Sequence, residues 1–344
     1  MRRRDAVLAS LALPLAAHGS MPLPRLAAAW DTPHGSRVGV LANGAAGWQV
    51  AADIEVPTRA HGVIVEPEGS LLSVARRPGD WMLRWHGSGR VVAWAWNDPG
   101  RCFNGHARRL GARLLTTETD LDSGGGCVVV RDARSLAVQA VWPSHGTDPH
   151  DLCVAADGTL WIANGGIDTR PETGRIAVDL NRMDSSLVRL DARTGRLLGQ
   201  WRLDDPRLSL RHLALRAGEL GIALQAQHDD PAQRANAPVL ARFDGRRLHV
   251  CDAPQPLAGY GGDIVATADG YVVSVPRAGG LATFDAGGRW RRHVPLPQAC
   301  ALAVHRADVF AAGSAALLAL HAGGRPESRP GPPVRLDNHW QALG

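Results

Sequence analysis

Several features that would assign the chain to a familiar class are missing from its 344 residues. Its five cysteines include no Cys-x-x-Cys pair, so they indicate neither a disulfide framework nor a structural zinc site, although a bond between Cys102 and Cys127 stays open. The basic residues are scattered arginines, the net charge is only +5, and no nucleic-acid-binding motif accompanies them. Beyond the N-terminus, no apolar run is long enough to cross a bilayer. We therefore expect no nucleic-acid partner and no transmembrane segment in the mature chain.

The N-terminus has the pattern of an export signal. Arg2, Arg3 and Arg4 precede an apolar segment, residues 7–17, which is too short to span a bilayer and has the length of a signal-peptide core. The paired arginines favour twin-arginine export over an ordinary secretory signal. We therefore expect residues 1–20 to be a signal peptide, residues 21–344 to form a single domain, and the mature protein to lie in the periplasm as a monomer.

The rest of the chain is a repeat of short strands. Apolar residues alternate with polar ones, helical periodicity is nearly absent, and groups of four strand-length runs recur every 37 to 62 residues. The groups start at His61, His106, His150, His212, Asp263, Cys300 and His339. Residues 165–184 are an insertion that accounts for the longest interval. Periods of about 40 to 50 residues with four strands each are typical of β-propeller blades.

The two ends of the chain complement each other. After His339 there is room for only one strand, whereas the N-terminus supplies three strands, Leu26–Trp30, Ser36–Leu41 and Gln49–Val56, with no first strand before them. One C-terminal strand and three N-terminal strands make a complete blade and leave no open edge at the seam. The sequence therefore predicts an all-β fold, a seven-bladed β-propeller closed by both ends. A six-bladed ring and an open sandwich are the alternatives.

The same repeat predicts where polar side chains gather. In a four-stranded blade, the start of the first strand and the end of the second lie on one face, so these positions should meet at one mouth of the central channel. Neutral imidazole is a common ligand of iron and copper, and a carboxylate can add an oxygen ligand. The candidate metal ligands are His61, His106, Glu118, His145, His150, His212 and His339. The alternative is that the histidines only hold neighbouring blades together.

Arginines on the same rim favour an anionic ligand, because guanidinium groups form forked hydrogen bonds to anions. The candidate residues for binding an anion or cofactor are Arg59, Arg76, Arg77, Asn164, Arg211 and Arg277. The insertion at 165–184 is long enough to cover the mouth as a lid.

Several of these segments resemble a known family. The chain is similar to the periplasmic propellers called domain of unknown function 1513 in Asn104-Gly105-His106, Ser144-His145-Gly146, Pro149-His150, residues 164–175, and Arg211-His212. The resemblance implies an exported propeller encoded beside imelysin-type and dihaem-peroxidase-like proteins in iron-responsive uptake clusters, and it brings no established reaction. The chain departs from the family pattern at Glu66-Pro67-Glu68-Gly69, where an Asp-Gly turn is usual.

Three functions follow from these patterns. The first is a periplasmic propeller that binds iron, copper or a small anion and assists iron uptake. The second is a metal-dependent oxidoreductase or lyase, and the third is a scaffold for imelysin-like or dihaem-peroxidase-like partners. No nucleophile–base arrangement, phosphate-binding loop or haem-attachment motif identifies catalytic residues.

Overall fold

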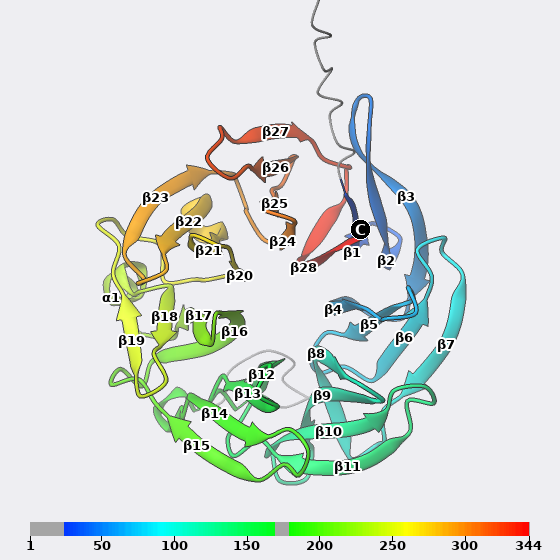
Figure 1. The fold of residues 1–344 in the computed structure, drawn as a ribbon, viewed down its shortest axis with the longest axis vertical. Helices are drawn as coiled ribbons and strands as arrows, with labels where there is room; N and C mark the ends of the chain where they lie inside the picture. The colour runs from blue at the N-terminus through cyan, green and yellow to red at the C-terminus, as the bar shows by residue number, and fades with distance from the viewer. Residues whose placement is uncertain (1–23, 169–178, 344) are drawn as a thin grey trace, which may run out of the picture.

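The structure is a computed structural model that describes residues 24–168 and 179–343. Its strands form five four-stranded sheets and one eight-stranded sheet, which are arranged around a common centre (Figure 1). This arrangement confirms the predicted all-β fold and is propeller-like. The predicted signal peptide lies outside the described residues, as does half of the predicted lid, residues 169–178.

Each four-stranded sheet extends from an innermost strand near the centre to an outermost strand at the rim. In that order, the sheets are β4 (Ala60–Val65), β5 (Leu71–Ala75), β6 (Trp81–Trp85) and β7 (Val91–Trp96); β8 (Arg101–Leu110), β9 (Arg113–Asp120), β10 (Gly126–Asp132) and β11 (Val138–Pro143); β12 (Pro149–Val154), β13 (Thr159–Asn164), β14 (Ser186–Asp191) and β15 (Leu197–Trp201); β16 (Leu208–Arg216), β17 (Glu219–Ala226), β18 (Leu240–Phe243) and β19 (Leu248–Cys251); β20 (Ile264–Ala266), β21 (Gly270–Val275), β22 (Gly280–Asp285) and β23 (Trp290–Pro295). Helices are few in the described ranges: α1 (Pro231–Asn236) and two 3-10 turns, Leu180–Arg182 and Pro276–Ala278.

The eight-stranded sheet contains both ends of the described chain. Its strands are β24 (Leu302–His305), β25 (Asp308–Ala312), β26 (Ala316–Leu320), β27 (Glu327–Pro330), β28 (Arg335–Leu343), β1 (Arg25–Thr32), β2 (Gly35–Gly44) and β3 (Gly47–Val56). The C-terminal strand β28 pairs antiparallel with β1, with Leu26 opposite Ala342 and Ala28 opposite Trp340, so the predicted pairing of the two ends is present. A single parallel pair, Leu302 with His339, joins β24–β27 to the other four strands.

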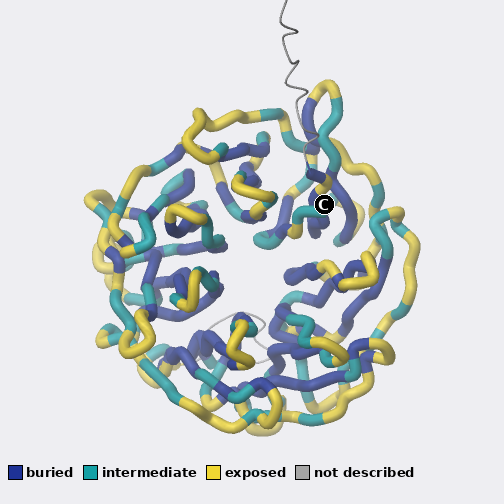
Figure 2. The backbone as a smooth tube through the Cα atoms, in the orientation of Figure 1, coloured by how far each residue is buried: buried dark blue, intermediate teal, exposed yellow. Residues whose placement is uncertain are grey.

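The apolar core lies between neighbouring sheets. Trp161 on β13 packs against Phe243 on β18, with ring centroids 5.2 Å apart, and Trp201 on β15 lies 4.6 Å from the same Phe243 ring. Burial is concentrated between the sheets, while the outermost strands carry most of the exposed residues (Figure 2). The middle strands, such as β5 and β13, are buried at every position because each sheet packs against a neighbour on both faces, whereas an outermost strand such as β7 alternates between exposed and half-buried positions.

One buried ion pair, between Glu66 and Arg84, ties two sheets together. The Glu66 carboxylate accepts hydrogen bonds from Nε and Nη2 of Arg84, at 2.6 and 2.8 Å. Arg84 Nη1 also donates to the carbonyl of Arg134 in the next sheet, at 2.8 Å. The buried Glu66 carboxylate thus orients an arginine that reaches across the interface.

All five cysteines are free, so the bond left open between Cys102 and Cys127 is absent. Burial raises the pKa of the Cys102 thiol to about 11 and that of Cys127 to about 12, which leaves both protonated and unreactive. We expect dithiothreitol to leave the melting temperature unchanged. A thiol titration of the unfolded, unreduced protein should count five thiols, whereas a count of three would reveal a disulfide bond.

Candidate metal centre

Five histidines meet on the innermost strands, and each lies where a strand bulges. The pairing register shifts around His61 in β4, His106 in β8, His150 in β12, His212 in β16 and His339 in β28. A bulge inserts unpaired residues and re-aims their side chains, so it turns a ring that would face a neighbouring strand towards the axis. We call these five residues the histidine cluster.

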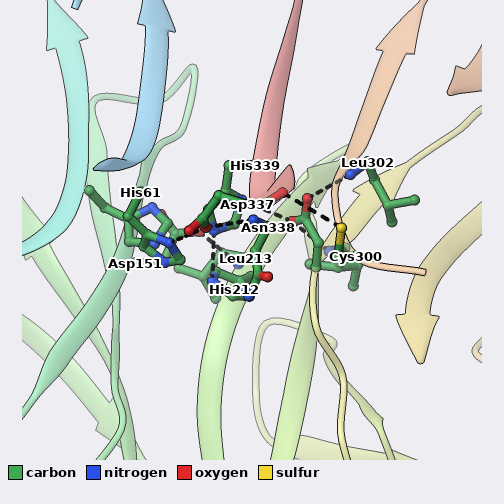
Figure 3. Close-up of polar contacts among 12 residues, drawn as sticks. His61, Asp151, His212, Leu213, Cys300, Leu302, Asp337, Asn338 and His339 are labelled. Atoms are coloured by element: carbon green, nitrogen blue, oxygen red, sulfur yellow. Dashed lines mark hydrogen bonds and ion pairs between the residues drawn. The ribbon is translucent and has the colours of Figure 1, made fainter. Parts of the chain in front are cut away.

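The rings of the histidine cluster are in mutual contact. The ring centroids of His212 and His339 are 4.4 Å apart, those of His61 and His339 are 4.5 Å apart, and those of His61 and His106 are 4.9 Å apart. One ligand nitrogen from each of His61, His106, His212 and His339 lies within 4.8 Å of the others. Figure 3 shows His61, His212 and His339 gathered beside Asp337.

Three buried carboxylates hold the outer nitrogens of three rings. His61 Nδ1 lies 3.0 Å from Asp337 Oδ1, His106 Nδ1 lies 3.3 Å from Asp151 Oδ1, and His339 Nδ1 lies 3.3 Å from Asp263 Oδ1. A carboxylate beside Nδ1 keeps the proton there and leaves the lone pair of Nε2 free, which is the usual arrangement behind a metal-bound histidine. Within the described residues, the buried His106 Nε2 has no hydrogen-bond partner.

The same carboxylates also connect sheets. Asp151 Oδ2 accepts from the backbone N–H of Leu213 at 3.0 Å, and Asp263 Oδ2 accepts from that of Leu302 at 2.9 Å. The histidines take part in these connections, since His61, His106 and His339 each contact an aspartate of a neighbouring sheet through Nδ1. This contact between blades uses the outer nitrogen of each ring and leaves the role of Nε2 open.

The contacts of His212 cannot all be hydrogen bonds. Its Nε2 lies 2.9 Å from His150 Nε2 and 3.0 Å from His339 Nε2. A ring nitrogen either donates one proton or accepts one, so it can satisfy only one of these two contacts. A cation between His212 and His339 would resolve the short contact between these two rings, because both lone pairs would then point at a positive charge.

Burial keeps four of the five rings neutral, as metal ligation requires. Burial, together with the nearby positive charge of His339, lowers the pKa of His61 to about 3. Burial likewise places the pKa values of His106, His150 and His212 well below their usual range. Burial also acts to lower the pKa of His339, but Asp263 outweighs it and the pKa is raised.

Two small cavities flank the cluster. The arginine-side cavity, about 20 Å³, is lined by His61, His150 and His212 and by three arginines, Arg76, Arg77 and Arg211. The carboxylate-side cavity, about 100 Å³, is lined by His106, His212 and His339 with Asp151 and Asp263. The cluster therefore has a different charge environment on each side.

The sequence placed these histidines at a channel mouth, but the structure places them deeper. His61, His106 and His212 are only 2–3% exposed, because they pack against one another and against buried aspartates of neighbouring sheets. Of the six residues predicted to bind an anion or cofactor, Arg76, Arg77 and Arg211 line a cavity together with the rings, whereas the other three do not. Arg59 pairs with Asp337 and Asp31, Asn164 donates to the Ser144 carbonyl, and Arg277 covers the Tyr260 ring.

Two predicted ligands lie apart from the cluster. Glu118 is fully buried in an ion pair with Arg131 (Nη2 to Oε1, 2.8 Å) and accepts from Thr116. His145 is exposed, and its backbone carbonyl accepts a hydrogen bond from Gln200. The sequence analysis missed Asp151, Asp263 and Asp337 as partners of the rings. The sequence contains a signal for two of them, because each lies at the start of a group of four strands: Asp151 follows His150, and Asp263 is itself the first residue of a group.

Gly105 allows β8 to approach the His61 ring. Its φ is +105°, and a Cβ there would lie 2.8 Å from His61 Cδ2. We expect Gly105→Ala to destabilise the fold by about 1–3 kcal/mol and to displace His61. Gly218 has a φ of +86° with no atom within 4 Å of a Cβ, so Gly218→Ala measures the backbone cost alone. Urea denaturation measures the unfolding free energy of both variants. If Gly105→Ala and Gly218→Ala lose the same amount, the close contact between Gly105 and the His61 ring is contradicted.

The sequence comparison decides the family. The family described as "Protein of unknown function (DUF1513)" matches residues 54–343. The chain belongs to this family. The resemblance read from its motifs is therefore confirmed, and the matched segment of this DUF1513 chain contains all five rings of the histidine cluster. No curated protein matches the sequence.

Solved structures that resemble the DUF1513 chain share its fold at low identity. Hydrazine synthase of Kuenenia stuttgartiensis is 10% identical with a TM-score of 0.58, covering 86% of this chain and 92% of that one. Apo AztD from Citrobacter koseri is 12% identical with a TM-score of 0.52, covering 93% and 97%. A nidogen/laminin complex is 11% identical with a TM-score of 0.52, also covering 93% and 97%. These neighbours support a propeller-like fold and nothing about activity.

Proposed function

We propose that this DUF1513 chain binds one transition-metal ion, iron or copper, at the histidine cluster. The observation that carries the proposal is the convergence of ligand nitrogens from His61, His106, His212 and His339 within 4.8 Å. Nitrogens about 2.0–2.1 Å from a common ion lie at most about 4.2 Å apart, so the group needs to contract by only about half an ångström. Imidazole nitrogens suit iron and copper, and the aspartates behind three rings supply the supporting shell.

The cluster belongs to a ring that we count as seven blades. The eight-stranded sheet divides into β24–β27 and β28 with β1–β3, which share only the pair Leu302–His339. Five four-stranded sheets and these two make seven. On this count, five blades contribute one histidine each, and the ion would lie on the axis where all of them meet.

The place of this site in the cell is also part of the proposal. The basic and apolar start of the chain supports export to the periplasm, and the family resemblance supports a role in iron uptake beside imelysin-like or dihaem-peroxidase-like partners. Among the described residues no helix has the length and apolarity needed to cross a membrane.

Metal loading tests the proposal. Metal-stripped protein is dialysed against Fe(II) without oxygen, against Cu(II) and against Zn(II), and the metal per chain is measured by mass spectrometry. We expect one equivalent of iron or copper, lost when His61 and His339 are both changed to alanine and retained in His145→Ala, because His145 is exposed and outside the cluster. If none of the three metals binds above the level of the double variant, the proposal is wrong and the scaffold function is favoured.

A further inference from the structure

We propose that the metal centre also takes a small anion of one or two atoms, and that His150 and Arg211 bind this anion while the other four histidines bind the metal. The inference rests on the function proposed above. It divides the five rings into four ligands and one hydrogen-bond donor, a division that the sequence does not show.

The position of the His150 proton follows from its neighbour. Arg211 Nη1 donates to Asp148 Oδ2 at 2.7 Å and lies 3.4 Å from His150 Nδ1. A guanidinium group can only donate, so Nδ1 of His150 faces it with a lone pair and the single proton of the neutral ring is on Nε2. A nitrogen that carries a proton cannot ligate a metal. In His61, His106 and His339 the carboxylates reverse the tautomer and leave Nε2 free.

The cavity beside His150 has the size and charge for a small anion. It is about 20 Å³, room for about one water-sized group. Three arginines line it; Asp148 pairs with Arg77 and Arg211, and Asp337 lies 3.8 Å from Arg76. On the other side of the rings, Arg108 lies with Asp151 and Asp263, and Arg59, which also contacts Asp337, is matched by Asp31. The arginines and aspartates around the rings therefore balance, and a divalent ion would add two positive charges in excess. A bound anion would reduce this excess in a buried site.

Metal binding would also deprive the Nε2–H group of His150 of its hydrogen-bond acceptor. Without a metal, the Nε2–H of His150 is directed at His212 Nε2, 2.9 Å away. Once the lone pair of His212 is directed at the ion, that acceptor is gone and the proton is left without a partner in a buried site. An anion at the open position of the metal, on the arginine side, would accept it together with a proton from Arg211.

The test uses fluoride, a one-atom anion, on the Cu(II)-loaded full chain. Direct coordination splits the electron paramagnetic resonance signal of copper through the fluorine nucleus, and titration of that splitting measures the dissociation constant. We expect His150→Phe to keep one copper per chain but to weaken fluoride binding about tenfold or more, as expected for a lost hydrogen bond to a charged group. The matched control His145→Phe should change neither quantity. Thiocyanate, which is larger than the cavity, should not compete with fluoride.

Each other result is decisive. Loss of copper in His150→Phe would make His150 a ligand and overturn the inference, while the metal site itself would stand. Unchanged fluoride affinity in His150→Phe, or no fluoride splitting in the unaltered protein, would also overturn it. Failure of the unaltered protein to bind copper or iron would instead defeat the proposed function. If His150→Phe does not fold, His150→Gln keeps an N–H donor and must retain both copper and fluoride binding.

Discussion

The His212→Ala variant should lose the increase in stability that a bound metal confers on the unaltered protein. His212 lines both cavities, and its Nε2 lies within 3.0 Å of the Nε2 atoms of both His150 and His339. It is thus the ring most central to the proposed coordination sphere. Its removal should reduce metal affinity by more than the about 10- to 100-fold that follows loss of an outer-shell partner.

The readout is the difference between the metal-loaded and metal-free proteins. At a free metal concentration 100 times the dissociation constant, binding stabilises the native state by about 2.7 kcal/mol. We expect this increment in the unaltered protein and in His145→Ala, and none in His212→Ala. Because each variant is compared with its own metal-free form, the packing lost with the imidazole does not enter the difference. A His212→Ala variant with the full increment would contradict the assignment of this ring as a ligand.

The Asp337→Ala variant should lose about 3–5 kcal/mol of unfolding free energy, the range for breaking a buried ion pair on one side. The Asp337 carboxylate is fully buried, pairs with Arg59, and lies 3.0 Å from His61 Nδ1. Burial alone would raise the pKa of Asp337, but the hydrogen bond with His61 and the nearby arginines outweigh it and the pKa is lowered. Alanine would leave those cations without their partner on the strand that joins the two chain ends.

Two further variants test whether the loss comes from the charge of Asp337 and whether it depends on the buried position of this residue. Asp337→Asn keeps an oxygen that accepts the backbone N–H of Asn338, so its loss should be smaller than that of alanine. Asp53→Ala removes an aspartate from a surface pair with Arg37, 3.1 Å apart, and should cost about 1 kcal/mol or less. Urea denaturation measures all three. Similar losses for Asp337→Ala and Asp53→Ala would show that Asp337 is not an essential counter-ion.

The difference between His145 and His150 shows where sequence reasoning stopped. Both rings follow short polar or Gly/Pro segments and are five residues apart, so the same pattern predicted both as ligands. Between them Asp148 takes a φ of +54° while its carboxylate pairs with Arg77 and Arg211 from other sheets. These distant partners hold Asp148 inside the molecule beside the buried His150, whereas His145 is exposed. Glu118 was misplaced for a similar reason, because its partner Arg131 lies on the neighbouring strand.

The sequence by itself determined which segments are strands, where each group of strands begins, that the two ends pair, and which family the chain belongs to. These are consequences of local alternation and turn residues, which act over a few positions and recur with the repeat. The tertiary structure alone decided the depth of the rings, their pairing with Asp151, Asp263 and Asp337, and the tautomer of His150. Those depend on bulges and on contacts between sheets, which join residues as far apart in the chain as His61 and Asp337.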